Sequence, residues 1–417
     1  MNFTRLLPAL LITFVDTFSF TVMIPVLPFI VEQYSYGDVL YGLLLSTYAF
    51  CQFIAAPFLG ALSDKYGRKP ILMLSQIGTV LSWVIFGIAY FSPDIKLLGL
   101  SLPILIIFFS RVIDGVTGGN ISVVMAFVAD VTREEKRAQT FGLVSAMGGL
   151  AMILGPVIGS LSYGTAIGYL GTIIVAGGIA LFALIFLTQI KESLPVTQRQ
   201  DRQLWECWTD LLLWNRIRKY RANNELLRLF NIKLFFSFSV NAFTTVIILF
   251  MIDAFGYSEK ELALILVVVG TMMIVNQLFM VKLFITQWGE AFSMVLSLFL
   301  MAGGLSLSIF FNSIYALLLC YYIMSIGISV GFSVFSALLT QKAPTNKQGE
   351  ILGLDTAIMA FTAGLAPIIG SLLYVGLSQY VFVLLGGIVL VGPVLNRLWL
   401  GKTSEVFLDM TEETSEV

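Results

Sequence analysis

The stretch Gly60-Ala-Leu-Ser-Asp64-Lys-Tyr-Gly67-Arg68-Lys69-Pro70 lies between two long apolar segments and is the part of the sequence that most narrowly specifies the fold. It contains two glycines, one acid and three bases. Glycine lets two backbones approach closely, and basic residues favour the cytoplasmic side of a membrane. The stretch therefore predicts a tight, positively charged cytoplasmic turn between two membrane helices.

Composition assigns the whole chain to the membrane proteins. Of its 417 residues, 58% are hydrophobic and only 12% are charged, which a soluble domain of this length does not tolerate. Spans of about 20 apolar residues cross a bilayer as helices. The sequence predicts twelve of them: 7–31, 41–62, 71–91, 103–130, 139–163, 166–190, 227–252, 262–285, 291–311, 313–340, 350–376 and 378–400. We therefore expect an all-α membrane protein.

The distribution of Lys and Arg predicts the orientation of the chain. The loops expected outside (32–40, 92–102, 164–165 and 253–261) hold only Lys96 and Lys260 among the bases. Most of the other bases lie in segments that this topology puts inside. The bias places both termini in the cytoplasm. The net charge of −1 implies no nucleic-acid partner.

The chain lacks the residues, or the spacing between residues, that several kinds of chemistry require. It has no histidine, and its three cysteines, Cys51, Cys207 and Cys320, lie in different segments without metal-ligand spacing. It has no nucleotide-binding loop of the Gly-x-x-x-x-Gly-Lys-[Ser/Thr] type, so ATP does not drive it directly. We expect no cofactor, no bound metal and no enzymatic activity.

The two halves of the chain repeat each other in parallel. Gly142 is followed 14 residues later by Pro156, and Gly353 is followed 14 residues later by Pro367, an offset of 211 in both cases. Each pair opens the fifth span of its half. Such a repeat predicts two six-helix bundles related by an axis along the membrane normal.

A charged segment separates the two predicted bundles. Within it, Trp205 and Trp208 recur at helical spacing with leucines, as in an amphipathic helix on the inner membrane surface; a solvated linker is the alternative. The predicted domains are an N-terminal bundle, a linker, a C-terminal bundle and an acidic disordered tail, at 1–190, 191–226, 227–402 and 403–417.

Three charged residues lie where the sequence predicts mid-membrane depth. Asp16 is about nine residues into the first span, and Arg111 is about eight residues into the fourth, three positions before Asp114. A charge in hydrocarbon costs on the order of several kcal/mol, so each needs a reason. Burial favours the neutral acid and a nearby cation favours the carboxylate, so Asp16 and Asp114 are candidate proton carriers. A static Arg111–Asp114 pair and a structural role for Asp16 remain the alternatives.

Four motifs together resemble those of a known family. They are the 60–70 loop, Arg111-Val-Ile-Asp114-Gly115 in the fourth span, Gly155-Pro156-Val-Ile-Gly159 in the fifth, and Pro25-Val-Leu-Pro28 after Asp16. The chain resembles the major facilitator superfamily, most closely its tetracycline/proton antiporters and related twelve-helix drug:proton antiporters. Ala151 and Ser160 replace glycines that are usual in the fifth-span motif.

The resemblance implies roles for particular residues. Arg111 would tune proton exchange with Asp16 and Asp114. Asp130 would clamp Arg68 while Asp64 faces the start of the eleventh span, and these contacts would hold an inner gate shut. The expected gate residues are Gly60, Asp64, Gly67, Arg68, Asp130 and Asp355, the last read as a gate or helix-capping residue. The expected packing residues of the antiporter motif are Gly142, Gly155, Pro156 and Gly159.

Amides within the spans predict a substrate cavity. We expect Gln52, Asn120, Asn241 and Gln277 to line it, because an apolar, aromatic pocket with a few amides suits an amphipathic organic compound. Lys233, near the inner end of the seventh span, is expected to extend its ammonium to the membrane interface; binding of an anionic substrate is the alternative.

The sequence thus predicts a secondary transporter that exports a small, amphipathic, drug-like compound in exchange for protons by alternating access. Its expected partners are that small molecule, protons and the lipid bilayer, and we expect a monomer in the bacterial inner membrane. Export of an endogenous metabolite such as a siderophore and proton-coupled import are alternatives within the same class. A non-transporting scaffold or receptor is the alternative of another class, against which the costly mid-depth charges argue.

Overall fold

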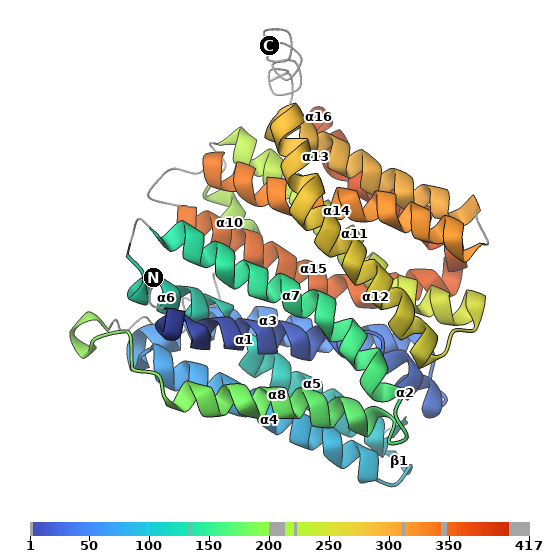
Figure 1. Cartoon of the computed structure of the whole chain (residues 1–417), viewed down its shortest axis with the longest axis horizontal. Helices are drawn as coiled ribbons and strands as arrows, with labels where there is room; N and C mark the ends of the chain where they lie inside the picture. The colour runs from blue at the N-terminus through green and yellow to red at the C-terminus, as the bar shows by residue number, and fades with distance from the viewer. Residues whose placement is uncertain are drawn as a thin grey trace. The chain divides into compact units, whose positions relative to one another are not determined.

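The computed structural model describes residues 3–97, 99–133, 136–199, 213–220, 223–310, 313–342 and 348–399 (Figure 1). In chain order its first elements are α1 (Phe3–Thr21), α2 (Leu27–Gln33), α3 (Asp38–Tyr66), α4 (Arg68–Phe91), β1 (Lys96–Leu97), β2 (Leu100–Ser101), α5 (Leu102–Gly118), α6 (Ile121–Val131), α7 (Arg137–Tyr163) and α8 (Tyr169–Thr188). The two short strands pair antiparallel.

The later elements are α10 (Leu213–Arg218), α11 (Asn224–Phe255), α12 (Glu259–Val275), a π-helical turn at Asn276–Met280, α13 (Val281–Leu307), α14 (Ile314–Lys342), α15 (Gln348–Leu377) and α16 (Val381–Trp399). Short 3-10 turns occur at Val196–Gln198, Ser308–Phe310 and Ser378–Tyr380. The predicted amphipathic helix around Trp205 and the acidic tail 403–417 lie outside the described residues.

The helices account for the predicted membrane spans. Nine described segments are long and apolar enough to cross a bilayer. Two of them hold two spans each: Glu259–Phe310 divides at Gly289 inside α13, whose φ of 72° is not helical, and Gly353–Arg397 holds α15 and α16. The shorter apolar helix Leu6–Thr21 supplies one more. The described part of the chain therefore contains the twelve spans that the sequence predicts.

The chain forms two compact units. One comprises Met1–Leu212, Thr245–Val267 and Pro367–Leu372, and the other comprises Leu213–Thr244, Val268–Ala366 and Leu373–Val417. They are called unit 1 and unit 2. The domain boundaries predicted from the sequence stay a prediction.

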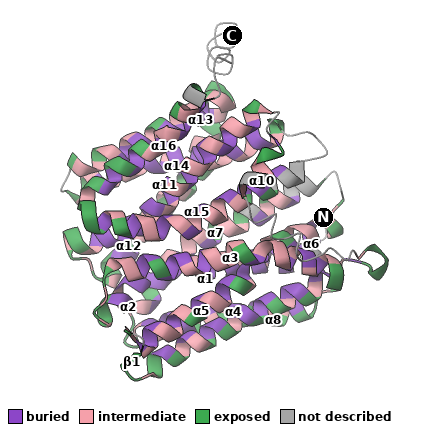
Figure 2. Ribbon diagram, turned by 180° about the vertical axis from the view of Figure 1, so that it is seen from behind, coloured by how far each residue is buried: buried purple, intermediate pink, exposed green. Residues whose placement is uncertain are grey.

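An outward-facing apolar stripe on α4 shows how the helices meet lipid. It consists of Leu74, Ile77, Leu81, Val84, Ile88 and Phe91, which recur every three or four residues and are each 47–75% exposed. The opposite face of α4 buries polar residues, among them Ser75, Gln76 and Thr79. Figure 2 shows the same division of exposed and buried residues along the helices. This arrangement is the reverse of a soluble helix and fits a hydrocarbon solvent.

Most of the 60–70 stretch is helical, although a loop was predicted there. Helix α3 continues to Tyr66 and α4 begins at Arg68, so Gly67 alone forms the turn. Its φ of 105° lies in the region that favours glycine. The predicted ends of the flanking spans, at 62 and 71, were therefore placed several residues too far apart.

Two spans that were expected to be continuous helices are interrupted. The first divides into α1 and α2 at residues 22–26, where Pro25 lacks a backbone N–H. The fourth divides into α5 and α6 at Gly119 and Asn120. A Cβ at Gly119 would lie 2.8 Å from the backbone nitrogen of Ala56, so α3 approaches the break closely.

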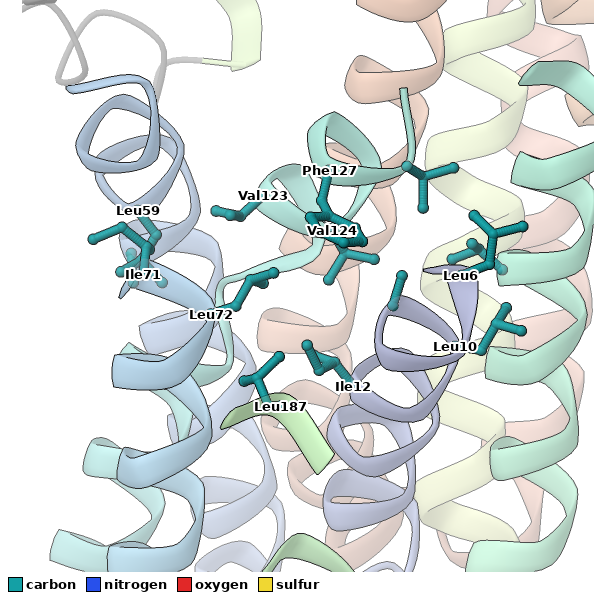
Figure 3. Close-up of a cluster of buried hydrophobic side chains, with 14 residues drawn as sticks. Leu6, Leu10, Ile12, Leu59, Ile71, Leu72, Val123, Val124, Phe127 and Leu187 are labelled. Atoms are coloured by element: carbon teal, nitrogen blue, oxygen red, sulfur yellow. The ribbon is translucent and has the colours of Figure 1, made fainter. Parts of the chain in front are cut away.

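The core of unit 1 is apolar at the end where α1, α3, α4, α6 and α8 converge. Figure 3 shows its buried side chains, including Leu6 and Leu10 of α1, Leu72 of α4, Phe127 of α6 and Leu187 of α8. Since lipid is as apolar as leucine, such packing holds the helices together by close contact more than by expulsion of water.

In unit 2, α13 and α14 pack closely at small residues. A Cβ at Gly327 of α14 would lie 2.5 Å from the carbonyl oxygen of Ser297 on α13. At the π-helical turn, the buried Asn276 side chain donates to Ser325 Oγ of α14 at 2.8 Å. Small residues and interhelical hydrogen bonds are typical of helix association in membranes.

Candidate functional site

Arg111 and Asp114 form a buried ion pair on α5. Arg111 Nη1 lies 3.3 Å from Asp114 Oδ2, and the two side chains are only 2% and 1% exposed. The contact expected from their three-residue spacing is confirmed. A buried pair of this kind is stable only while both partners are present.

Aromatic rings of α4 surround the Arg111 guanidinium. Its central carbon lies 5.2 Å from the Trp83 ring and 5.5 Å from the Phe86 ring, within the range of cation–π attraction. The indole of Trp83 donates in turn to Ser19 Oγ of α1 at 3.2 Å. Among the described residues, Arg111 Nε and Nη2 have no hydrogen-bond partner. The Asp114 carboxylate and the faces of the two rings thus hold the guanidinium, and two of its nitrogen atoms donate to no described residue.

Asp16 lies on α1 close to the same region of unit 1. Its side chain is buried, with the residue 8% exposed, and its Oδ1 atom has no hydrogen-bond partner among the described residues. The side-chain amide of Asn120 faces the carboxylate, and Tyr48 donates its hydroxyl to the Asp16 carbonyl oxygen at 3.4 Å. A buried carboxyl group with a vacant oxygen is a suitable proton acceptor.

Two residues expected to line a cavity belong to the polar network around Asp16. Asn120 donates to Ser75 Oγ, which donates to the Thr117 carbonyl oxygen at 2.5 Å. Gln52 donates to the Gly118 carbonyl oxygen at 2.9 Å. These bonds satisfy backbone groups freed by the break between α5 and α6. Asn120 is only 1% exposed, and its role in lining a cavity stays a prediction.

Arg68 joins two acids where α3 meets α4 in unit 1. Its guanidinium lies 2.5 Å from Asp64 Oδ1 and 3.3 Å from Asp130 Oδ2, and donates to Ser63 Oγ at 2.6 Å. The Arg68–Asp130 contact implied by the resemblance is present. The additional Arg68–Asp64 pair was not predicted. Gly60, one turn before Asp64, packs against Ser122 of α6.

Glu192, just after α8, is a member of this cluster that sequence reasoning missed. Its carboxylate accepts from the backbone N–H groups of Arg68 and Lys69 at 2.9 and 3.1 Å. It thereby satisfies donors at the start of α4, where a negative charge is also favoured. The next residue, Ser193, donates to Asp130 Oδ2 at 3.0 Å. No local sequence pattern connects Glu192 with a helix start 124 residues away.

The fifth-span motif packs α7 against the end of α1, but only in part. A Cβ at Gly155 would overlap the side chain of Thr21, and one at Gly159 would overlap the carbonyl oxygen of Val22. Pro156 lies between them in α7. Gly142 differs: no described atom lies within 4 Å of where its Cβ would be. The packing role expected for Gly142 is therefore wrong for the described neighbours.

Unit 2 contains a second buried ion pair. Lys233 Nζ of α11 lies 3.1 Å from Asp355 Oδ1 of α15, with the side chains 0% and 9% exposed. The same ammonium lies 4.9 Å from the Phe332 ring and 5.5 Å from the Phe335 ring of α14. The prediction that Lys233 extends its ammonium to the membrane interface is wrong. The Asp355 carboxylate neutralises this ammonium in the interior of unit 2.

The remaining cavity candidates also lie in unit 2. Asn241 of α11 donates to Thr362 Oγ1 of α15 at 3.3 Å. Gln277 lies in the π-helical turn and donates to Ser333 Oγ at 3.1 Å. Within the described residues, no group of three or more His, Cys, Asp or Glu side chains could hold a metal ion.

A comparison with protein families identifies the fold. The profile described as "Major Facilitator Superfamily" matches residues 9–290 and 229–409. The chain belongs to the major facilitator superfamily. Members of this superfamily are membrane transporters of small molecules, and the two overlapping matches agree with the repeat seen in the sequence.

Several curated relatives have names that refer to drug resistance. "Tetracycline resistance protein, class H" of Pasteurella multocida is 26% identical over 372 residues, covering 88% of each chain. "Multidrug resistance protein 2" of Bacillus subtilis (strain 168) is 26% identical over 397 residues, covering 94% of each chain. "Tetracycline resistance protein, class E" of Escherichia coli is 37% identical over 165 residues, 39% of this chain and 38% of that one.

Solved structures of the superfamily share the fold at low identity. The structure of a D-xylose-proton symporter is 15% identical, covers 95% of this chain and 97% of its own, and has a TM-score of 0.73. That of the human organic anion transporter MFSD10 (TETRAN) is 20% identical, covers 94% and 99%, and has a TM-score of 0.71. These likenesses establish the fold alone.

Proposed function

We propose that this transporter exports a small, amphipathic, drug-like compound in exchange for protons. The observation that carries the proposal is the group of buried charges in unit 1, formed by Asp16 and the Arg111–Asp114 pair. Placing three charged residues inside apolar helices costs on the order of several kcal/mol each before pairing. Transport driven by protons requires a group that binds a proton in the membrane, and no histidine exists to do so.

Asp16 is the proposed proton carrier. Its Oδ1 atom has no hydrogen-bond partner in the described part of the chain, so a proton can be added there without breaking a bond. Addition of one proton converts the carboxylate to a neutral acid, and its release restores the charge. The Asp114 carboxylate is already neutralised by Arg111 at 3.3 Å. Arg111 therefore sets how readily Asp114 shares in the exchange.

The substrate class and direction rest on the relatives. Two of them carry names that refer to resistance to tetracycline and to multiple drugs, and removal of the drug from the cell is the transport direction that gives resistance. Stoichiometric exchange of a proton moving inward for substrate moving outward would supply the driving force. The bias of Lys and Arg supports cytoplasmic termini in a bacterial inner membrane.

Proteoliposome transport with an imposed pH gradient tests the proposal. The purified protein should move at least one compound of a drug panel against its concentration gradient, and collapse of the pH gradient should stop accumulation. Asp16→Asn should abolish driven transport, whereas Asp94→Asn, at an exposed loop position, should not. Accumulation in the opposite direction would identify an importer, and absence of transport for drugs, metallophores and metabolites alike would favour a scaffold or receptor.

A further inference from the structure

The Lys233–Asp355 pair of unit 2 has features of a ligand site that is filled by the chain itself. The ammonium of Lys233 touches a carboxylate at 3.1 Å and two phenyl rings at 4.9 and 5.5 Å. A carboxylate with aromatic faces is the chemistry with which proteins recognise organic ammonium groups. Phe236 of α11 contacts both Phe332 and Phe335, at ring-centroid distances of 5.3 and 5.2 Å, and so keeps the two rings in place.

The site surrounds its cation with one carboxylate and two ring faces. A lysine ammonium has three N–H donors, yet Lys233 Nζ and Asp355 Oδ1 both lack an aligned hydrogen bond to any described residue. At 3.1 Å the ammonium and the carboxylate form an ion pair. A cation with no donors, such as a quaternary ammonium, can make the same charge contact with Asp355 and the same contacts with the two rings.

Two members of the site are not fully buried. Lys233 is fully buried, whereas the Asp355 side chain is 9% exposed and Phe332 is half-buried. An arriving cation would thus meet Phe332 and Asp355 first. Lys233 would leave along its flexible four-carbon stem.

The Ser237 hydroxyl is a buried hydrogen-bond acceptor for a displaced Lys233. Ser237, one helical turn beyond Lys233 on α11, is fully buried, and its hydroxyl has no hydrogen-bond partner among the described residues. Exchange of one cation for another keeps Asp355 neutralised, while the displaced Lys233 ammonium keeps its charge and can donate to the Ser237 hydroxyl, which does not neutralise it. The polar contact between the two helices continues two turns on, where Asn241 bonds Thr362.

We propose that Phe332, Phe335 and Asp355 form a binding site for the ammonium group of an organic cation, and that Lys233 occupies this site as a tethered competitor when no ligand is present. This inference deepens the proposed function by assigning a positive charge to the substrate. Because occupancy by Lys233 lowers the competent fraction of the site, removal of its charge should raise the apparent affinity in proportion.

Binding of benzyltrimethylammonium to the purified full-length protein in phosphatidylcholine nanodiscs tests the proposal. Lys233→Met removes the charge and nearly keeps the side-chain length, and should tighten binding about tenfold. Adding Asp355→Asn to this variant should remove the gain. Lys282→Met, at an exposed position of α13, is the matched control and should bind as the wild type does.

A second variant keeps the test decisive if Lys233→Met does not fold. Phe332→Leu leaves the ion pair intact and removes one ring face, and should weaken wild-type binding of the same probe at least fivefold. Unchanged affinity in folded Lys233→Met, or in Phe332→Leu when Lys233→Met fails to fold, would overturn the proposal. Loss of benzenesulfonate binding in Lys233→Met would overturn it too, by making Lys233 a ligand for anions. Binding is measured without a gradient, so failure of driven transport would count against the proposed function and not against this site.

Discussion

The carboxylate of Glu192 accepts a hydrogen bond from the backbone N–H of Arg68 at 2.9 Å. Glu192 thus fixes the start of α4 and the backbone of Arg68, whose guanidinium binds Asp64 and Asp130. Gly67 permits this approach, since a Cβ there would overlap Glu192. The segment after α8 is therefore a structural part of the Arg68 ion-pair cluster.

Glu192→Ala should destabilise that cluster. The variant leaves two backbone donors of α4 without an acceptor, and loss of a helix-capping side chain costs about 1 kcal/mol. We expect a lower thermal unfolding midpoint in detergent, with Glu192→Gln less affected because its amide oxygen can still accept. A midpoint for Glu192→Ala equal to that of the wild type would show that water replaces the cap at no cost.

Arg68→Ala and Asp130→Asn should shift the population of conformations if these residues form an inner gate. A contact network worth a few kcal/mol changes a two-state ratio about 100-fold. Spin-label distances between the cytoplasmic ends of the two halves should therefore lengthen in both variants. Lys65→Ala, which changes a neighbouring base outside the Arg68 ion pairs, serves as control. Identical distance distributions in all four proteins would remove the gate assignment.

Asp16→Asn should separate substrate binding from proton coupling. The amide cannot take up and release a proton, but it retains a polar side chain of the same size beside Asn120. We expect normal amounts of folded protein, a retained drug dissociation constant and no accumulation driven by a pH gradient. Wild-type pumping by this variant would transfer the role to Asp114.

Arg111→Ala should be more harmful than Arg111→Lys. Truncation leaves the Asp114 carboxylate buried without its countercharge, and breaking such a pair costs about 3–5 kcal/mol. Lysine keeps the charge over Trp83 and Phe86 but loses the planar guanidinium, so partial transport is expected. The double variant Arg111→Ala with Asp114→Asn should recover stability over Arg111→Ala without recovering driven transport. Normal transport against a gradient by Arg111→Ala would make the pair structural.

Gly155→Ala and Gly142→Ala should have opposite effects, although they change the same residue type in one helix. At Gly155 the added methyl group meets Thr21 of α1, and overpacking costs about 1–3 kcal/mol. At Gly142 the space is open among the described residues, and alanine favours a helix by about 1 kcal/mol over glycine. Thermal unfolding of the two variants checks this; equal midpoints would contradict the close contact between α7 and α1.

The sequence by itself determined the membrane class, the twelve spans and the Arg111–Asp114 contact. The apolar composition shows that the chain is a membrane protein, and the length of each apolar segment shows whether it can cross the bilayer. A spacing of three residues places two side chains on one face of a helix. The turn at Gly67 could also be predicted from the sequence, because a tight turn requires glycine for a local reason. All of these follow from neighbours along the chain.

Only the tertiary structure decided which helices meet and through which atoms. Lys233 was expected to seek the interface, but α11 and α15 bring it to Asp355, 122 positions away in the sequence. Glu192 has no local signal for its role at the start of α4. The breaks at Pro25 and Gly119 depend on whether nearby helices satisfy the freed backbone groups. Rotation and close packing of helices set such contacts, and neither is fixed by the order of residues within one helix.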